Sequence, residues 1–167
     1  FHQFHFLYLK LIDLAFNQFE ETYSVYELAE KVKEVALVTD TENSTPEEAG
    51  QVSMFFNNRW YGIQFTRDDT LDPVSRLDIS RLQDSILRPI LGIEDPRTSN
   101  RIDFIGGIRG LKELKNRCSL DSKVAFALYP VSIEELMKVA DSGKIMPPKS
   151  TWFEPKLRSG MVVRLLN

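Results

Sequence analysis

Residues 52–65, VSMFFNNRWYGIQF, decide the fold more clearly than any other part of the chain. Two runs rich in aromatic and β-branched side chains, 52–56 and 59–65, flank the pair Asn57-Asn58. Asparagine tolerates a positive φ angle, which both central residues of a tight two-residue hairpin turn require. The stretch therefore predicts a β-hairpin, and with it a sheet.

Three further stretches on the C-terminal side predict strands for that sheet. VAFALY, residues 124–129, is apolar throughout and indicates a buried strand. IDFI, residues 102–105, predicts a short strand, and MVVRLL, residues 161–166, predicts a last one.

Helices are predicted between these strands. Apolar side chains at helical spacing indicate a helix over about 78–91, with Asp78 as a plausible cap and Gly92 as its end. Ser132 with Glu135 three residues later is the capping-box pattern of a helix start. Hairpin, buried strands and helices together predict an α+β fold: one domain, with a mixed sheet covered by helices.

The first fifty residues are predicted to be a helical N-terminal segment followed by an acidic loop. Apolar side chains recur at helical spacing within residues 1–38. Two stripes carry this pattern: Leu7, Leu11 and Leu14, then Tyr26, Leu28, Ala29 and Val32. Residues 39–50, TDTENSTPEEAG, are polar and acidic and indicate a surface loop. We therefore divide the chain into residues 1–50 and an α+β domain over 51–167.

Composition narrows the class of protein. Hydrophobic residues make up 43% and charged residues 27% of the chain, which is typical of globular proteins. No apolar run approaches the roughly 18 residues of a membrane span. The apolar stretch 6–16 is interrupted by Lys10 and Asp13 and does not show a signal-peptide pattern. With a single cysteine, Cys118, an internal disulfide is excluded, and we expect a cytoplasmic protein without a membrane partner.

The charge balance argues against a general DNA-coating role. The chain carries 21 basic and 24 acidic residues, for a net charge of −3. Neutralisation of phosphates by basic side chains supplies most of the affinity of DNA-binding proteins. Nucleic acid is therefore not an expected partner.

A strand-to-helix bend, Ile105 to Gly110, carries the first candidate anion site. Gly106 and Gly107 could direct backbone N–H groups at an anion, and Arg109 would add positive charge. The alternative interpretation is a tight turn in which Arg109 pairs with an acid such as Asp103. Both interpretations stay open.

A second candidate follows two prolines, at Lys149, Ser150 and Thr151. A lysine beside two hydroxyls suits phosphate or carboxylate recognition, although the glycines of a P-loop are absent. The alternative is an irregular connection whose hydroxyls cap turns. The predicted anion-binding set is Gly106, Gly107, Arg109, Lys149, Ser150 and Thr151.

No catalytic residue, cofactor or metal site is predicted. His2 and His5 are the only histidines and have no evident third metal ligand, and their scarcity removes Ser-His-Asp schemes. The acids Asp68, Asp69 and Asp72 are interpreted as a solvated loop.

Three stretches resemble the C-terminal portion of the DUF1015 family of bacterial and archaeal proteins. They are NNRWYGIQF (57–65), LDISRLQDSILRPILGIEDPRTSNRIDFIGGIRGL (77–111) and VAFALYPVSIEELMKVADSGKIMPPKSTWFEPKLRSGMVV (124–163). The resemblance runs from about residue 55 to the end of the chain. Its most specific part is IMPPKSTWFEPKLRSG, residues 145–160.

The resemblance implies a longer protein of unknown function. Family members are labelled ParB-like or Spo0J-like, and their N-terminal part carries a DGHHR-type motif like that of the ParB and sulfiredoxin superfamily. Members of that superfamily bind nucleotides or phosphates, some phosphorylate free serine, and DUF1015 genes often lie beside genes of serine biosynthesis. This chain lacks the motif, and residues 1–50 match poorly, so the missing N-terminal part of its own protein is an expected partner.

Two classes of function follow. In the first, the intact protein is a phosphate- or nucleotide-handling enzyme linked to serine metabolism, and a phosphorylated small molecule or nucleotide is the ligand. In the alternative, the protein is a non-enzymatic ParB/Spo0J-like DNA-associated or protein-interaction module.

Overall fold

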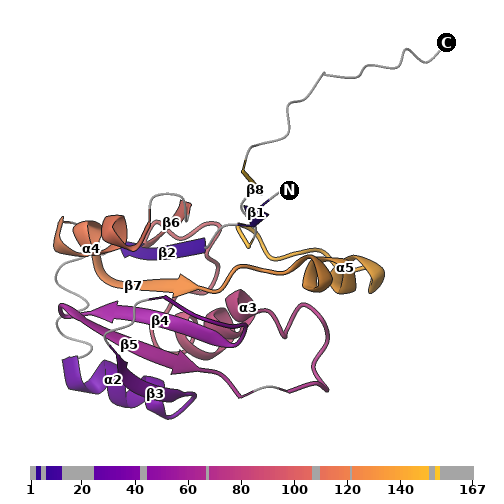
Figure 1. The fold of residues 1–167 in the computed structure, drawn as a ribbon. Helices are drawn as coiled ribbons and strands as arrows, with labels where there is room; N and C mark the ends of the chain where they lie inside the picture. The colour runs from indigo at the N-terminus through magenta and orange to yellow at the C-terminus, as the bar shows by residue number, and fades with distance from the viewer. Residues whose placement is uncertain are drawn as a thin grey trace.

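The computed structural model describes residues 3–4, 7–12, 25–41, 45–66, 68–106, 110–120, 122–150 and 153–154. Six strands form one sheet in the order β3-β5-β4-β7-β2-β6, and β1 pairs with β8 in a separate two-stranded sheet (Figure 1). The strands are β1 (Gln3–Phe4), β2 (Leu7–Ile12), β3 (Leu37–Thr41), β4 (Gln51–Phe56), β5 (Arg59–Gln64), β6 (Ile102–Gly106), β7 (Ser122–Leu128) and β8 (Phe153–Glu154). The helices are α2 (Val25–Lys33), α3 (Asp78–Leu82), the π-helix η1 (Gln83–Leu87), α4 (Gly110–Leu120) and α5 (Ile133–Asp141).

The predicted hairpin is confirmed. β4 and β5 pair from Phe56 opposite Arg59 to Gln51 opposite Gln64. The turn residues Asn57 and Asn58 have φ angles of 48° and 61°. The asparagine pair therefore supplies the positive φ values that join the strands directly.

The buried strand predicted at 124–129 is confirmed as β7. It lies between β4 and β2, and all its residues from Val124 to Leu128 are buried. The α+β class is confirmed, with one difference from the expected mixed sheet. Every pairing among the described strands is antiparallel.

The prediction that residues 1–38 are helical is wrong at residues 7–12, which form β2. It is also wrong at its end, where β3 begins at Leu37 and runs into the predicted surface loop. β2 pairs with both β6 and β7 inside the sheet. Leu7 and Leu11 are four residues apart, which fits one helical turn but also two strand repeats. The second N-terminal helix is confirmed as α2, where Leu28 and Val32 are fully buried.

Helices cover both faces of the sheet. On one face, Val52, Met54 and Phe126 pack with buried residues of α2, α3 and η1. On the other face, Phe55 and Ala125 pack with Leu114 of α4. Figure 1 shows α4 beside β2 and β7, and α2 beside β3.

The helix predicted over 78–91 begins at Asp78 as expected, but Asp78 does not cap it. The N-cap is Leu77, without a side-chain bond, and α3 continues directly into η1. The helical segment ends at Leu87, earlier than predicted; residues 88–91 form turns, and Gly92 follows them at a φ of 64°. The Asp78 carboxylate instead reaches across to another segment.

The predicted capping box of α5 is confirmed. The backbone N–H of Glu135 donates to the Ser132 hydroxyl at 3.1 Å, and the Ser132 N–H donates to the Glu135 carboxylate at 2.8 Å. Among the described helices, none combines the length and apolar character of a membrane span. The strand predicted at 161–166 lies outside the described residues.

Candidate functional site

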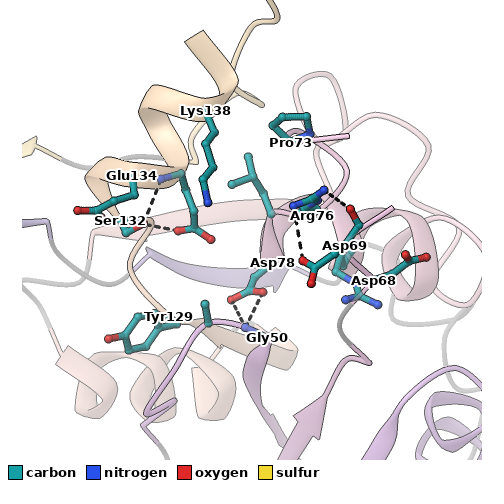
Figure 2. Close-up of a pocket in the computed structure, with 14 residues that line it drawn as sticks. Gly50, Asp68, Asp69, Pro73, Arg76, Asp78, Tyr129, Ser132, Glu134 and Lys138 are labelled. Atoms are coloured by element: carbon teal, nitrogen blue, oxygen red, sulfur yellow. Dashed lines mark hydrogen bonds and ion pairs between the residues drawn. The ribbon is translucent and has the colours of Figure 1, made fainter. Parts of the chain in front are cut away.

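A cavity of about 340 Å³ lies where α3, the loop before it and the start of α5 meet the beginning of β4 (Figure 2). Three of its lining residues are cations: Arg76, Arg81 and Lys138. Five are carboxylic acids: Asp68, Asp69, Asp78, Glu134 and Glu135. The cavity is therefore strongly polar and carries both signs of charge.

Asp78 connects α3 to the beginning of β4. Its two carboxylate oxygens lie 2.9 and 3.0 Å from the backbone nitrogen of Gly50, which donates to them. Gly50 has a φ of +95°, and a Cβ there would lie 3.1 Å from Nε2 of Gln64. Glycine is thus required in the turn that brings this N–H to Asp78.

The acids of the loop before α3 are exposed or half-buried, in agreement with the solvated-loop interpretation, and two of them also hold the loop through hydrogen bonds. Asp68 accepts from the backbone N–H and hydroxyl of Thr70, and these bonds lower the pKa of Asp68. Asp72 accepts from the Ser75 hydroxyl at 2.6 Å and from the Lys144 ammonium at 2.9 Å. These two contacts hold the pKa of Asp72 well below its usual range. These hydrogen bonds therefore hold the loop in place beside the cavity.

The two arginines of the cavity already have contacts. Arg76 donates to the carbonyl groups of Leu71 and Asp69, and lies 3.5 Å from the exposed Asp69 carboxylate. The guanidinium of Arg81 lies over the Phe65 ring, 5.2 Å from its centroid. Such a cation–π contact uses the guanidinium face and leaves its edge N–H donors available.

Lys138 is the cation best placed to meet a ligand. Its side chain extends from α5 into the cavity in Figure 2. Within the described part of the chain, its ammonium group has neither an ion pair nor a hydrogen bond. An ammonium in this position offers three donors to an incoming anion.

The balance of charge limits which ligands the cavity can take. Three positive and five negative side chains leave the lining with a net charge of −2. An isolated multivalent anion would be repelled by this excess. A ligand that also brings positive charge, such as a phosphate with its divalent cation, fits it.

The bend that carries Lys149 and Ser150 lies beside this cavity. Ser150 is 4% exposed and lines a small void of about 10 Å³. That void shares Asp78, Tyr129 and Glu135 with the main cavity. One of the two anion sites predicted from the sequence, the one that contains Ser150, therefore lies next to the cavity.

The Ser150 hydroxyl follows the turn-capping interpretation. It donates to the Pro147 carbonyl at 2.6 Å, while the neighbouring Lys149 is exposed at a φ of 59°. Gly106 is the last residue of β6. Gly107, Arg109 and Thr151 lie outside the described residues, so their convergence with Lys149 stays a prediction.

Sequence reasoning missed the three cations of the cavity. Arg76 and Arg81 flank the start of α3, whereas Lys138 comes from α5. No local motif joins residues so far apart in the chain. The one available signal was the Glu135–Lys138 spacing, which places both side chains on one face of α5.

The described residues contain no ready-made metal centre. Among them, no group of three or more His, Cys, Asp or Glu side chains is placed to hold an ion. Asp95, in the loop before β6, pairs with Arg97 at 2.7 Å. A divalent cation in the cavity would therefore need ligand atoms from a bound phosphate.

Comparison with known proteins gives one kind of match. No protein-family model and no curated protein matches the chain. Two solved structures do match, both of mutants of a free serine kinase in complex with AMP. The likeness is one of fold. Each comparison has a TM-score of 0.50 and 15% identity, and covers 91% of this chain but 54% of the other. The chain thus spans about half the length of the structures it matches.

Proposed function

We propose that this chain is the C-terminal portion of a DUF1015-type protein, and that its α3–α5 cavity binds a nucleotide or another phosphorylated metabolite. The family resemblance of residues 57–65, 77–111 and 124–163 supports the first part. The fold likeness to a free serine kinase that holds AMP supports the second. A volume of about 340 Å³ is in the range of small-molecule sites.

The observation that carries this proposal is the position of Lys138. It extends into the cavity without an ion pair in the described residues, and Arg76 and Arg81 line the same space. Charge-assisted hydrogen bonds from lysine and arginine to phosphate are roughly twice as strong as neutral ones. These side chains are therefore the proposed phosphate contacts.

The carboxylates fit the divalent cation that accompanies nucleotide phosphates. Mg²⁺ usually binds through one or two carboxylates together with the phosphates of the substrate and several waters. Asp78 and Glu135 both line the main cavity and the small void beside it. We propose that they face the cation, which would offset the net negative charge of the lining.

The proposal has two further parts. They are the anion contacts predicted from the sequence and the N-terminal part that the family resemblance implies. The proposed anion contacts remain Lys149, Ser150, Thr151, Gly106, Gly107 and Arg109. The place of Ser150 beside the cavity supports the group at 149–151. We propose that the N-terminal part of the family supplies the reacting groups, in an enzyme linked to serine metabolism.

Calorimetric titration tests this function. AMP and ATP, each with Mg²⁺, are titrated into the wild type, Lys138→Glu and Lys112→Glu. Lys112 is exposed on α4, which covers the opposite face of the sheet from α3. We expect wild-type binding, a loss of about ten-fold or more in Lys138→Glu, and no change in Lys112→Glu. Absence of binding, or equal losses in both variants, would refute the proposal.

A further inference from the structure

A second hollow of about 340 Å³ lies over β3, β5 and β4. It has no lining residue in common with the α3–α5 cavity. Its polar residues include Thr39, Ser53, Gly62 and Gln64. Because α4 packs against β7, β2 and β4, this end of the sheet face has no helix over it among the described elements. We call this hollow the sheet groove.

The floor of the sheet groove is a row of three paired residues. Thr39 lies opposite Gly62, and Gly62 lies opposite Ser53. Residues directly opposite in antiparallel strands share one face of the sheet. Gly62 has no side chain, and a Cβ there would lie only 3.0 Å from the Thr39 hydroxyl oxygen. The row is therefore a notch between two hydroxyl groups.

Both hydroxyls have unused hydrogen-bonding capacity. Ser53 is 4% exposed, yet its side chain makes no hydrogen bond within the described residues, and the same is true of Thr39. Thr39 is exposed and Ser53 lines the groove, so both hydroxyls can exchange bound water for the hydroxyl groups of a ligand. The Gln64 amide donates to the Gly50 and Phe65 carbonyls, and its oxygen has no partner there.

The chemistry of the sheet groove differs from that of the charged cavity. Hydroxyls and carboxamides dominate its lining, and Glu47 is its only charged residue. Hydroxyl groups donate and accept hydrogen bonds at once, and a carboxamide does both through different atoms. We infer that the sheet groove is a second ligand site, for a neutral molecule with vicinal hydroxyl groups such as the ribose of a nucleoside or a free sugar. This inference does not depend on phosphate binding in the α3–α5 cavity.

NMR titration with two uncharged probes tests the second site. Adenosine and D-ribose are added separately to the ¹⁵N-labelled chain. We expect shifts at the amides of Thr39, Ser53 and Gly62 with at least one probe. Shifts with adenosine alone identify a nucleoside site, and shifts with D-ribose identify a sugar site. If neither probe moves these amides, or if 2′,3′-dideoxyadenosine binds as tightly as adenosine, the inference is overturned.

Two variants of the notch add a second measurement. Thr39→Val keeps the volume of the side chain but removes its hydroxyl, so affinity should fall about five-fold, the effect of one neutral hydrogen bond. Gly62→Ala fills the notch and should weaken binding more. Thr98→Val removes an exposed hydroxyl from another loop and should change nothing. Unchanged affinity in Thr39→Val would also overturn the inference, because this variant retains the strand.

Discussion

At the scale of the residue, Asp72 connects two walls of the charged cavity. Its carboxylate accepts from Ser75 within the loop before α3 and from Lys144 just after α5. The hydrogen bonds stabilise the charged form, which is why the pKa of Asp72 is lowered. The ionised Asp72 carboxylate is therefore one of the groups that hold this loop.

Asp72→Asn should make the chain less stable at pH 7 and less sensitive to acid. A carboxyl group with a lowered folded-state pKa contributes stability above its unfolded pKa, near 3.9, and loses it as the pH falls through the folded value. Urea unfolding between pH 7 and pH 2.5 measures this, with the exposed Asp141→Asn as a control. The same acid dependence in Asp72→Asn and the wild type would contradict the proposed role.

Lys149 occupies a backbone conformation that favours glycine. A non-glycine residue at a φ of 59° costs roughly 1–2 kcal/mol. Lys149→Gly should therefore raise the free energy of unfolding by up to about 1 kcal/mol, since the flexibility of glycine in the unfolded chain offsets part of the gain. Chemical denaturation measures the change. If the lysine is an anion contact, the same variant binds AMP more weakly, and an unchanged affinity would remove Lys149 from the proposed site.

At the scale of the element, α5 carries Lys138, the proposed phosphate contact, and Glu135, a proposed contact of the divalent cation. Its start is fixed by Ser132 and Glu135, and Lys138 follows one turn later on the same side. The capping pair was predictable because its two partners are three residues apart in the sequence. The strand β2 was not, because Leu7 and Leu11 fit a helix and a strand equally, and only pairing with β6 and β7 decides between them.

Ser132→Ala should destabilise the chain by about 1 kcal/mol, the typical cost of losing an N-cap hydroxyl. Ser132→Thr retains a capping hydroxyl and is the matched control. Urea midpoints of the two variants and the wild type give the comparison. Equal stability of the alanine and threonine variants would show that the capping box does not hold α5 in place.

At the scale of the whole molecule, the sheet places the charged cavity beside α3 and α5 and leaves a polar groove over β3, β5 and β4. The α+β class could be predicted, since hairpin, buried strand and helix signals are local. The cavity could not, because Arg76 and Lys138 come to line one space only when α5 has packed through Val139 on the core. The bend at Ser150 could be predicted as a polar segment from its lysine and hydroxyl groups, but only the folded structure shows that it lies beside the cavity.

Duplex DNA should not bind this chain at physiological ionic strength. The net charge of −3 and the acidic excess in the cavity both oppose contact with phosphate backbones. A gel-shift assay across a range of salt concentrations measures this. A shift that weakens as salt rises would favour the alternative function, a DNA-associated module.

Chemical-shift mapping with AMP and Mg²⁺ tests most directly whether the α3–α5 cavity is the phosphate site. The proposed site predicts that the amides of Gly50, Asp78, Ser132 and Lys138 shift together and saturate with one apparent affinity. Amides of α4, on the other face of the sheet, should stay in place. Shifts confined to α4 or to other surfaces, or no shifts at millimolar AMP, would contradict it.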